Sequence, residues 1–406
     1  MNTMDQDFKA VRVSEHVHWV GAIDWDIRDF HGYSTLRGST YNAYLITADD
    51  PILIDTVKHS HKHELLARVA SVIDPGEIRY IVSNHSEPDH SSSLMEVIAE
   101  VKPERVFASK LGLKDLAGYY GPDGIEAVAD AQTMKLGGVD LTFLETKMIH
   151  WPDSMMTYLA DDKLLFSQDG FGMHLATSER FADELNEGEM YEENSKYFAN
   201  ILLPYKQLIV KLLDRVKSLG IPIEVIAPDH GPIWRKDLDK AINQYYEWCA
   251  QKPTKKAVIT FDTMWGSTEM MARAAEEGLE SEGIEVIVLP MKSSDRSVVI
   301  TEVLEAGALL VGSPTLNNNI FPSVADVLTY MRGLKPRNLV GAAFGSYGWS
   351  GEGARQVNDY LTDMKVELVR DPLNLSFRPD SEGIEQCRQL GAAVGKRLKE
   401  LIQSDD

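Results

Sequence analysis

Cysteine is scarce in this chain. Only two cysteines, Cys249 and Cys387, occur among its 406 residues. They lie far apart and form no CxxC pair, which excludes a disulfide framework, a zinc site built from cysteines and an iron–sulfur cluster. We expect both thiols to be half-buried and chemically inert.

Long apolar runs are also missing. No segment approaches the roughly 18–20 apolar residues that are needed to cross a bilayer. Residues 1–20 carry charges throughout and contain no apolar stretch of the kind found in a secretory signal. We therefore expect a cytoplasmic protein that does not enter a membrane.

Positive charge is low relative to negative charge. Lys and Arg number 41 against 62 Asp and Glu, so the formal net charge is -21. A surface this acidic repels phosphate groups, which disfavours nucleic acids and anionic membranes as partners. The composition is otherwise ordinary, with 44% hydrophobic residues, and it predicts a folded chain of two or three domains.

The order of the expected elements divides the chain into two domains. Residues 1–250 mix short strands with helices, including a hairpin over 41–55 and one long helix over 191–219, which favours a layered α/β sandwich. Residues 251–254 are the best candidate for a linker. In residues 255–406 five strands alternate with five helices, a pattern typical of a doubly wound parallel sheet.

One short segment concentrates residues that bind metals. After a predicted strand, the sequence Asn-His-Ser-Glu-Pro-Asp-His places His85, Glu87, Asp89 and His90 within six residues. Clustered carboxylates and imidazoles are costly to bury unless a cation neutralises them. The segment therefore predicts a metal site.

Three further candidates follow other predicted strands. They are His150, Asp169 and His230. Taken singly, each is as consistent with a structural role as with a functional one. Together with the first segment they give four imidazoles and three carboxylates, which is more than one ion needs and fits two ions that share a carboxylate.

Three polar loops follow strands of the second domain, at the edge where ligands bind in open parallel sheets. The first loop precedes a helix, and hydroxyls and backbone N–H groups at a helix N-terminus bind phosphate, although an ordinary N-cap is the alternative. The patterns for nucleoside triphosphates and dinucleotides are missing, which leaves the monophosphate of FMN. The candidate residues of the three loops are Thr263, Met264, Trp265, Gly266, Ser267, Thr268, Pro314, Thr315, Leu316, Asn317, Asn318, Asn319, Ser346, Tyr347, Gly348, Trp349 and Ser350.

The order of the ligands in the first domain resembles the metallo-β-lactamase superfamily, whose fold is an αββα sandwich with ligands on loops at one edge. The usual hydrolase motif is HxHxDH and favours zinc, whereas this chain has Glu87 in place of the second histidine. A carboxylate makes the site harder and more anionic, which suits iron better than zinc, although Glu also binds zinc. The second domain resembles flavodoxin.

The two domains together resemble the flavodiiron proteins, also called A-type flavoproteins. The resemblance covers essentially the whole chain and includes residues 38–45, 150–154 and 262–268. It implies a metallo-β-lactamase-like αββα sandwich followed by a flavodoxin-like doubly wound sheet. It also implies a non-haem diiron site in which one iron is held by His85, Glu87 and His150, the other by Asp89, His90 and His230, with Asp169 as the bridge.

The resemblance further implies an activity. Electrons would pass through FMN to the irons, which would reduce dioxygen to water or nitric oxide to nitrous oxide, and the shared ligand set does not choose between the two gases. The donor would be a separate molecule, rubredoxin or reduced coenzyme F420, because the chain lacks a four-cysteine rubredoxin module. In the family, the flavin of one chain lies near the irons of another in a head-to-tail dimer.

Protons must also reach the irons. Our candidates for their delivery are His31, Tyr197 and His174, in that order, and the alternative for each is an ordinary packed polar residue.

Other functions fit some of these residues. One is a zinc-dependent hydrolase of the metallo-β-lactamase fold with an accessory flavodoxin domain. A second is a flavin-dependent quinone or disulfide reductase whose first domain serves only for dimerisation. A third is a binding protein without catalytic activity.

Overall fold

The computed structural model describes residues 8–121 and 124–405, which form two compact units. The first unit extends through His31 and continues over Thr35–Tyr197 and Gln207–Gln244; the second comprises Gly32–Ser34, Phe198–Lys206 and the long segment from Tyr245 onward. The domain limits expected from the sequence, at 250 and 255, stay a prediction.

The first unit contains a seven-stranded mixed sheet. The strands follow in the order β1 (Val11–Arg12), β2 (Val17–Trp19), β7 (Tyr44–Ile46), β8 (Ile52–Ile54), β9 (Tyr80–Ser83), β10 (Arg105–Ser109) and β11 (Ile125–Val128). The hairpin expected over 41–55 is confirmed, because β7 pairs antiparallel with β8. From β8 to β11 the neighbouring strands are parallel, so β8, β9 and β10 end at the same edge.

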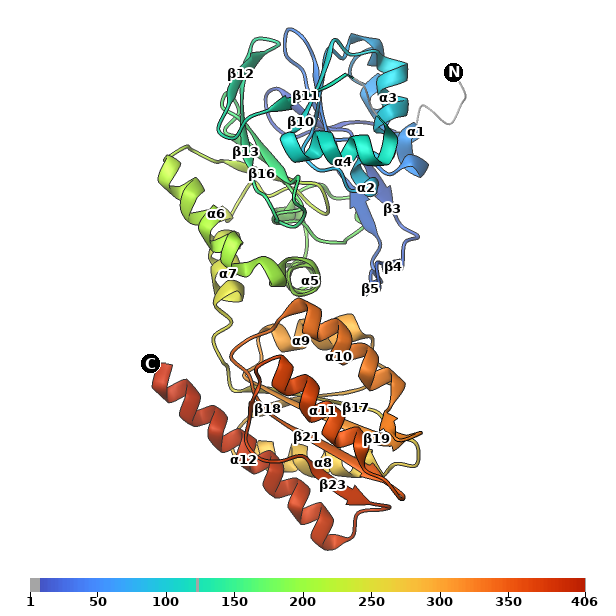
Figure 1. The fold of residues 1–406 in the computed structure, drawn as a ribbon. Coiled ribbons are helices and arrows are strands. Elements are labelled where there is room, and N and C mark those ends of the chain that lie inside the picture. Colours follow the sequence, from blue (N-terminus) through green and yellow to red (C-terminus); the bar gives the residue numbers. More distant parts are fainter. Residues whose placement is uncertain (1–7, 122–123, 406) are drawn as a thin grey trace. The chain divides into compact units, whose positions relative to one another are not determined.

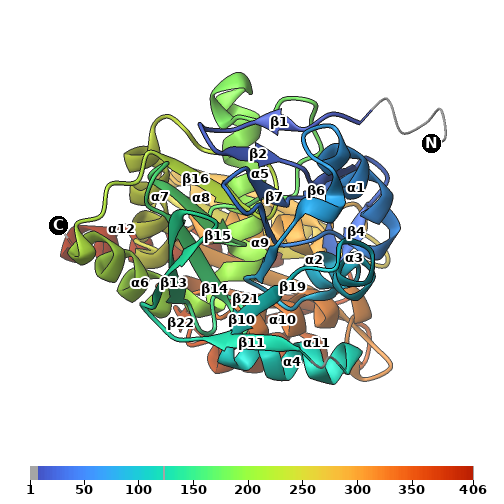
Figure 2. The ribbon, with the colours of Figure 1, turned by 90° about the horizontal axis from the view of Figure 1, so that it is seen from above.

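A five-stranded sheet packs against the first one. Its strands are β12 (Thr133–Leu136), β13 (Val139–Glu145), β14 (Met155–Leu159), β15 (Leu164–Gln168) and β16 (Val225–Pro228), and β13 to β16 lie side by side in Figure 2. One buried cluster joins Trp19, Tyr44 and Ile54 of the first sheet to Phe143 and Phe166 of the second. The two sheets therefore share a core, as in a sandwich.

Helices cover the other face of the first sheet. Side chains alternate along a strand, so Leu45, Leu53 and Ile81 point away from the sandwich core and pack against the helices. These helices are α1 (Lys62–Ala70), α3 (Leu94–Val101) and α4 (Lys110–Tyr120), which lie together beside β10 and β11 in Figure 1. The metallo-β-lactamase-like fold is thereby confirmed.

The prediction of a single helix over 191–219 was wrong. The structure has α5 (Glu187–Tyr197), a π-helical turn (Phe198–Leu202), a 3-10 turn (Leu203–Tyr205) and α6 (Lys206–Leu219). Pro204 lies in the 3-10 turn. Proline has no N–H to donate and its ring clashes with the preceding turn of an α-helix, which explains the break. A further helix, α7 (Leu238–Ala250), follows β16.

The second unit is a doubly wound parallel sheet. Its strand order is β18 (Glu285–Pro290), β17 (Lys256–Phe261), β19 (Ala308–Leu316), β21 (Val340–Tyr347) and β22 (Glu367–Leu368), and β23 (Leu373–Ser376) also pairs with β21. The helices are α8 (Ser267–Ser281), α9 (Arg296–Leu304), α10 (Pro322–Leu334), α11 (Glu352–Asp363) and α12 (Ser381–Asp405). Figure 1 shows α9 and α10 on the opposite side of this sheet from α8 and α12. The flavodoxin-like fold is confirmed.

The helices α8 and α12 approach each other closely. A Cβ atom added at Gly391 would lie 1.9 Å from the carbonyl oxygen of Ala275, and one added at Gly278 would lie 2.0 Å from that of Arg388. Only glycine permits backbones this close, and the contact brings Leu390 and Val394 of α12 into the same buried cluster as α8.

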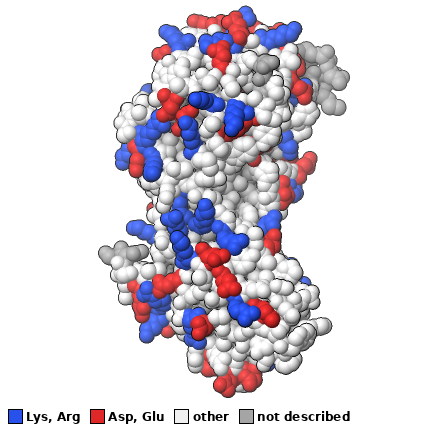
Figure 3. Space-filling view, viewed as in Figure 1, with Lys and Arg blue, Asp and Glu red and all other residues white. Residues whose placement is uncertain are grey.

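The surface carries charges of both signs. In Figure 3, Lys and Arg lie interspersed with Asp and Glu on the visible face of each unit. None of the described helices is both long enough and apolar enough to pass through a bilayer.

Candidate metal centre and flavin pocket

Buried hydrogen bonds fix the start of the loop after β9, which carries four predicted ligands. The Asp55 carboxylate accepts hydrogen bonds from the Asn84 backbone N–H at 2.6 Å and from Asn84 Nδ2 at 2.8 Å. The hydroxyl of Thr157 donates to Asn84 Oδ1 at 2.6 Å. These bonds tie the end of β9 to β14 and to the residue after β8, so the side chains that follow leave the sheet edge in a defined direction.

The first set of predicted ligands converges on one point. His85 Nε2 lies 3.2 Å from Glu87 Oε2 and 3.3 Å from Asp169 Oδ2. His150 Nε2 lies 3.2 Å from the same Glu87 oxygen and 2.9 Å from the same Asp169 oxygen. Four residues from three separate loops therefore present two nitrogens and two carboxylates to a common centre.

The second set converges beside the first. His90 Nε2 lies 3.1 Å from His230 Nε2 and 3.4 Å from Asp89 Oδ2, and His230 Nε2 lies 3.2 Å from that Asp89 oxygen. Asp169 reaches this set through its other oxygen, since Oδ1 lies 3.6 Å from His230 Nε2 and 3.8 Å from His90 Nε2. Each oxygen of Asp169 thus faces one set.

These separations match the edges of a metal's coordination shell. Metal–ligand bonds of about 2.1 Å to nitrogen and oxygen place neighbouring ligands about 3.0–3.4 Å apart. Both Asp89 oxygens and Asp169 Oδ1 are buried without a hydrogen-bond partner among the described residues. Buried carboxylate oxygens are rarely left so, and cations between the sets would satisfy them. The residues therefore fit a pair of ions.

The charges in the first set stabilise one another even without an ion. Burial opposes ionisation of Asp169, but the hydrogen bond from His150 and the nearby imidazoles outweigh it and hold the Asp169 pKa below its ordinary value. Burial alone would lower the pKa of His150, yet hydrogen bonds to Asp169 and Glu87 raise it to about 9. An arriving cation would displace protons from these imidazoles, so binding is coupled to proton release.

Oxygen acceptors lie next to the Nδ1 atoms of two of the histidines, the ring nitrogens that point away from the converging ligands. His85 Nδ1 lies 3.4 Å from Asp153 Oδ2, and that carboxylate also accepts a 2.6 Å hydrogen bond from the Ser86 backbone N–H. His230 Nδ1 donates to the Thr40 carbonyl oxygen at 2.6 Å. With Nδ1 carrying the proton, Nε2 is free to bind a metal.

The three proposed proton-delivery residues lie around these sets. His31 Nε2 is 3.2 Å from Glu87 Oε1, and its side chain is 72% exposed. His174 is buried, shares a 2.8 Å hydrogen bond with the Ser39 hydroxyl and lies 4.7 Å from His230 between ring centroids. The Tyr197 ring is 5.1 Å from that of His174.

Phe30 was missed in the sequence. Its ring lies 4.4 Å from His31 and 4.8 Å from His174, between ring centroids. The only signal was its position directly before His31, because a phenylalanine in a short polar segment gives no indication of what it packs against.

The three polar loops of the second unit surround one pocket of about 360 Å³, a size typical of small-molecule sites. Most of the predicted flavin residues line it: Met264, Trp265, Ser267, Pro314, Thr315, Leu316, Asn317, Asn318, Ser346, Tyr347, Gly348, Trp349 and Ser350. Aromatic side chains that could stack on a flavin ring therefore stand beside a helix N-terminus that could bind its phosphate. The pocket fits FMN.

The remaining flavin candidates lie outside this lining. Thr263 and Thr268 support the loops, since Thr263 Oγ1 accepts the Gly266 N–H at 3.0 Å and Thr268 Oγ1 lies 2.9 Å from Ser346 Oγ. Asn319 belongs to the short strand β20 (Asn319–Ile320), which pairs with β19. Phe377 lines the pocket and was missed, because it follows β23, a strand that the sequence did not predict.

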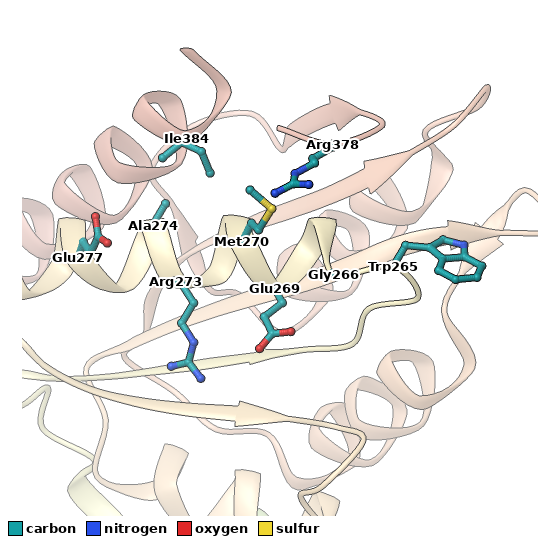
Figure 4. Close-up of a pocket in the computed structure, with 9 residues that line it drawn as sticks. All are labelled: Trp265, Gly266, Glu269, Met270, Arg273, Ala274, Glu277, Arg378 and Ile384. Carbon is teal, nitrogen blue, oxygen red and sulfur yellow. The ribbon is translucent and has the colours of Figure 1, made fainter. Parts of the chain in front are cut away.

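Gly266 lines a different hollow. Its volume is about 560 Å³, and it runs along α8 past Met270 and Arg273, with Arg378 on its other side (Figure 4). Trp265 lines both hollows and in Figure 4 lies beyond the N-terminal end of α8.

Comparisons with known proteins agree with this division. Residues 40–231 match the family model described as ODP family beta lactamase, and residues 259–391 match flavodoxin. A nitric oxide reductase from Moorella thermoacetica is 42% identical over 96% of this chain and 99% of its own. The chain belongs to the flavodiiron protein family.

Solved structures give the same result. The rubredoxin oxygen:oxidoreductase from Desulfovibrio gigas has 41% identity and a TM-score of 0.95 over 97% of this chain and 100% of that one. The flavodiiron protein from Giardia intestinalis has 36% identity and a TM-score of 0.94 over 98% of each chain.

Family membership establishes the class of protein. The chain is an oxidoreductase with a flavodoxin domain for FMN and a diiron site in its metallo-β-lactamase-like domain. The zinc hydrolase considered from the sequence is not favoured, because these relatives are named as oxidoreductases.

Proposed function

We propose that this flavodiiron protein reduces dioxygen to water, or nitric oxide to nitrous oxide and water, with electrons from a separate carrier. When bound, FMN and two irons supply the electron storage and gas binding that side chains cannot provide. One iron would be held by His85, Glu87 and His150, and the other by Asp89, His90 and His230, with Asp169 between them.

The position of Asp169 carries this proposal. One of its oxygens lies within 3.3 Å of His85 and His150, and the other lies 3.6 Å from His230. A carboxylate placed this way can hold two ions next to each other, which is what a two-centre reduction of a diatomic gas requires. A single structural ion would not need this arrangement.

The surrounding side chains have separate tasks. His31 joins solvent to the first set, because its exposed ring is hydrogen-bonded to Glu87. Tyr197 and His174 are buried next to His230 and would bring protons to the second set from the protein side. Phe30 packs against both His31 and His174 and would keep bulk water away from the gas.

Exposed apolar side chains support a head-to-tail dimer. Trp265, Trp349 and Phe377 line the flavin pocket and are 94%, 90% and 70% exposed. Large exposed aromatic residues around one pocket mark an interaction surface. The partner that we propose is a second copy, whose metal centre would lie near this flavin.

The electron donor that we propose is a separate carrier. The name of the Desulfovibrio gigas relative points to rubredoxin, and reduced coenzyme F420 is the alternative that the sequence left open. We propose rubredoxin on the strength of that name, and the brief contact that an electron carrier needs near the flavin fits a small protein partner.

Anaerobic stopped-flow spectroscopy tests the proposal. Protein reconstituted with FMN and iron is mixed first with reduced rubredoxin or with reduced F420, and then with dioxygen or nitric oxide. We expect two irons and one FMN per chain, flavin reduction by rubredoxin, and rapid reoxidation by at least one gas. Reoxidation at the same rate in protein that holds FMN but no iron would contradict the proposal.

Dilution tests the dimer separately. If electrons pass between chains, gas reduction per chain must fall as the dimer dissociates, whereas flavin reduction by the donor must not. Sedimentation at the same concentrations gives the oligomeric state. Gas reduction that stays constant while the protein becomes monomeric would exclude the head-to-tail arrangement.

A further inference from the structure

Asp229 is a buried carboxylate to which no ligand role has been given so far. It directly precedes His230 at the end of β16 and has no solvent exposure. Neither of its side-chain oxygens has a hydrogen-bond partner within the described residues. Its backbone is held independently, because its N–H donates to Gln168 O at 2.9 Å and its carbonyl accepts the Asn42 N–H at 2.7 Å. Burying this side chain therefore costs desolvation free energy that no hydrogen bond to it offsets among the described residues.

The group that Asp229 faces is the rear nitrogen of a predicted ligand. Asp229 Oδ2 lies 3.9 Å from His90 Nδ1, and that nitrogen is also buried without a hydrogen-bond partner among the described residues. The other nitrogen of His90, Nε2, faces Asp89 and His230. Asp229 thus faces Nδ1, the nitrogen of His90 that is turned away from Asp89 and His230, although one ligand atom each of His90, Asp169 and Asp229 also lie within 4.8 Å of one another.

The other histidines show what is missing. His85 has Asp153 behind its Nδ1, and His230 has the Thr40 carbonyl behind its Nδ1. A histidine that binds metal through Nε2 must carry its proton on Nδ1, and that N–H needs an acceptor. For His90, Asp229 is the carboxylate nearest to this nitrogen among the ion pairs of the described residues.

We propose that Asp229 is a positioning residue for the second iron, and that one of its oxygens accepts the hydrogen bond of the His90 Nδ1–H when the iron is bound. This proposal rests on the diiron function proposed above. The present separation exceeds a hydrogen bond by about 1 Å, so the two side chains must move toward each other on metal binding. The hydrogen bond then fixes the plane of the His90 ring and makes its Nε2 a better ligand.

The test compares iron retention in variants of the full-length protein reconstituted with FMN and ferrous iron. Asp229→Leu removes both acceptor oxygens and replaces the carboxylate with a larger apolar side chain of similar branching, and Asp229→Ala is the second variant in case leucine does not pack. The reciprocal variant Asp153→Leu removes the acceptor behind His85. Asp162→Asn changes a buried carboxylate elsewhere in the same unit, which hydrogen-bonds to His16, and serves as the control.

Iron per chain is measured after exposure to increasing chelator, and anomalous scattering at the iron edge identifies the ligand set that has lost its ion. We expect Asp229→Leu to weaken retention of the ion at Asp89, His90 and His230 by about 10–100-fold and to keep the other ion. Asp153→Leu should instead weaken retention of the ion at His85, Glu87 and His150. Asp229→Asn, which keeps one acceptor oxygen, should retain more iron than Asp229→Leu. The FMN content should be the same in all variants.

Two results would overturn this role. The first is wild-type iron retention in a folded Asp229→Leu or Asp229→Ala protein. The second is equal loss of both ions, which would indicate a general structural effect. If the wild-type protein itself bound fewer than two irons, the diiron proposal would fail instead, so the two failures can be distinguished.

Discussion

The Nε2 atom of His150 lies 2.9 Å from the Oδ2 atom of Asp169, although the two residues follow different strands. This contact closes the first ligand set. Since the other Asp169 oxygen faces His230, the same carboxylate joins both sets. Loss of this one side chain should therefore affect both ions together.

The first prediction concerns this bridge. Asp169→Asn keeps the size of the side chain but replaces one oxygen with an amide nitrogen, which cannot bind a metal. We expect iron content to fall well below two per chain and gas reduction to fall by roughly 100-fold or more. Flavin reduction by the donor should be unchanged, because the pocket lies in the other unit. Gas reduction that survives in this variant would favour a flavin-only reductase.

The second prediction concerns FMN binding. Ser267 is the first residue of α8 and lines the pocket, so its hydroxyl and N–H are placed to bind a phosphate. Ser267→Ala should weaken FMN binding about 10-fold, the effect of one hydrogen bond to a charged group. Ser281→Ala, at the other end of the same helix, is the matched control and should leave affinity unchanged. Fluorescence titration of apoprotein with FMN measures both, and equal affinities would place the phosphate elsewhere.

The third prediction concerns the close approach of α8 and α12. In Gly391→Ala, the new methyl group would meet the Ala275 carbonyl at 1.9 Å, so the helices must separate. We expect a loss of about 1–3 kcal/mol in unfolding free energy and earlier release of FMN on heating. Gly333→Ala in α10 has no atom within 4 Å of the new group and should be neutral or stabilising by about 0.5 kcal/mol. Equal melting temperatures of the two variants would show that α8 and α12 can separate without loss of stability.

The fourth prediction concerns pH. The hydrogen bond from His16 to Asp162 raises the pKa of His16 above 6.5, and hydrogen bonds from Ser14 and His16 outweigh burial to hold the pKa of Asp162 below 3.8. The His16 contribution is therefore complete below pH 6.5 and is lost as pH rises through the higher, folded-state pKa. The Asp162 contribution is lost on the acid side, as pH falls through its lowered pKa.

Urea unfolding of wild type and His16→Gln measures this effect. Between pH 3.8 and pH 6.5, the ordinary pKa values of Asp162 and His16, the wild type should be more stable than the variant by about 0.5 kcal/mol. The effect is small because His16 is one-third exposed and solvent screens the pair. The difference should shrink in alkaline buffer. A difference that grows with pH would reverse the sign and refute the assignment.

Much of the fold could be predicted from local pattern. The strict alternation after residue 255 gave the doubly wound sheet, because each βα unit is a local pattern. The break at Pro204 was predictable from proline chemistry and was overlooked within an otherwise helical stretch. The helix α4 was also overlooked, although Ser109 caps its start by accepting the Gly112 N–H and Gly121 ends it with a φ of 63°.

Some residues of the candidate site could be predicted from the sequence and others could not. The proposed ligands lie at strand ends, and their imidazole and carboxylate groups are of types that bind metals, so His85 and Asp169 could be named from the sequence. Asp229, Phe30 and Phe377 could not, because their roles depend on neighbours brought close only by the fold. A buried carboxylate next to a ligand has no distinctive sequence pattern, and its missing partner is visible only in three dimensions.

The seven proposed ligands come from loops on both sheets of the sandwich, spread from residue 85 to residue 230. A pair of cations among them would join the two layers, in addition to their shared apolar core and to buried hydrogen bonds such as that from Thr157 to Asn84. Newly made chain that has not yet acquired metal would leave the buried oxygens of Asp89 and one oxygen of Asp169 without a partner between the two sheets. We expect such chain to open locally at this boundary more often, and to be degraded by proteases faster, than the iron-bound protein. Scarcity of iron would then shorten the lifetime of the protein as well as abolish its activity.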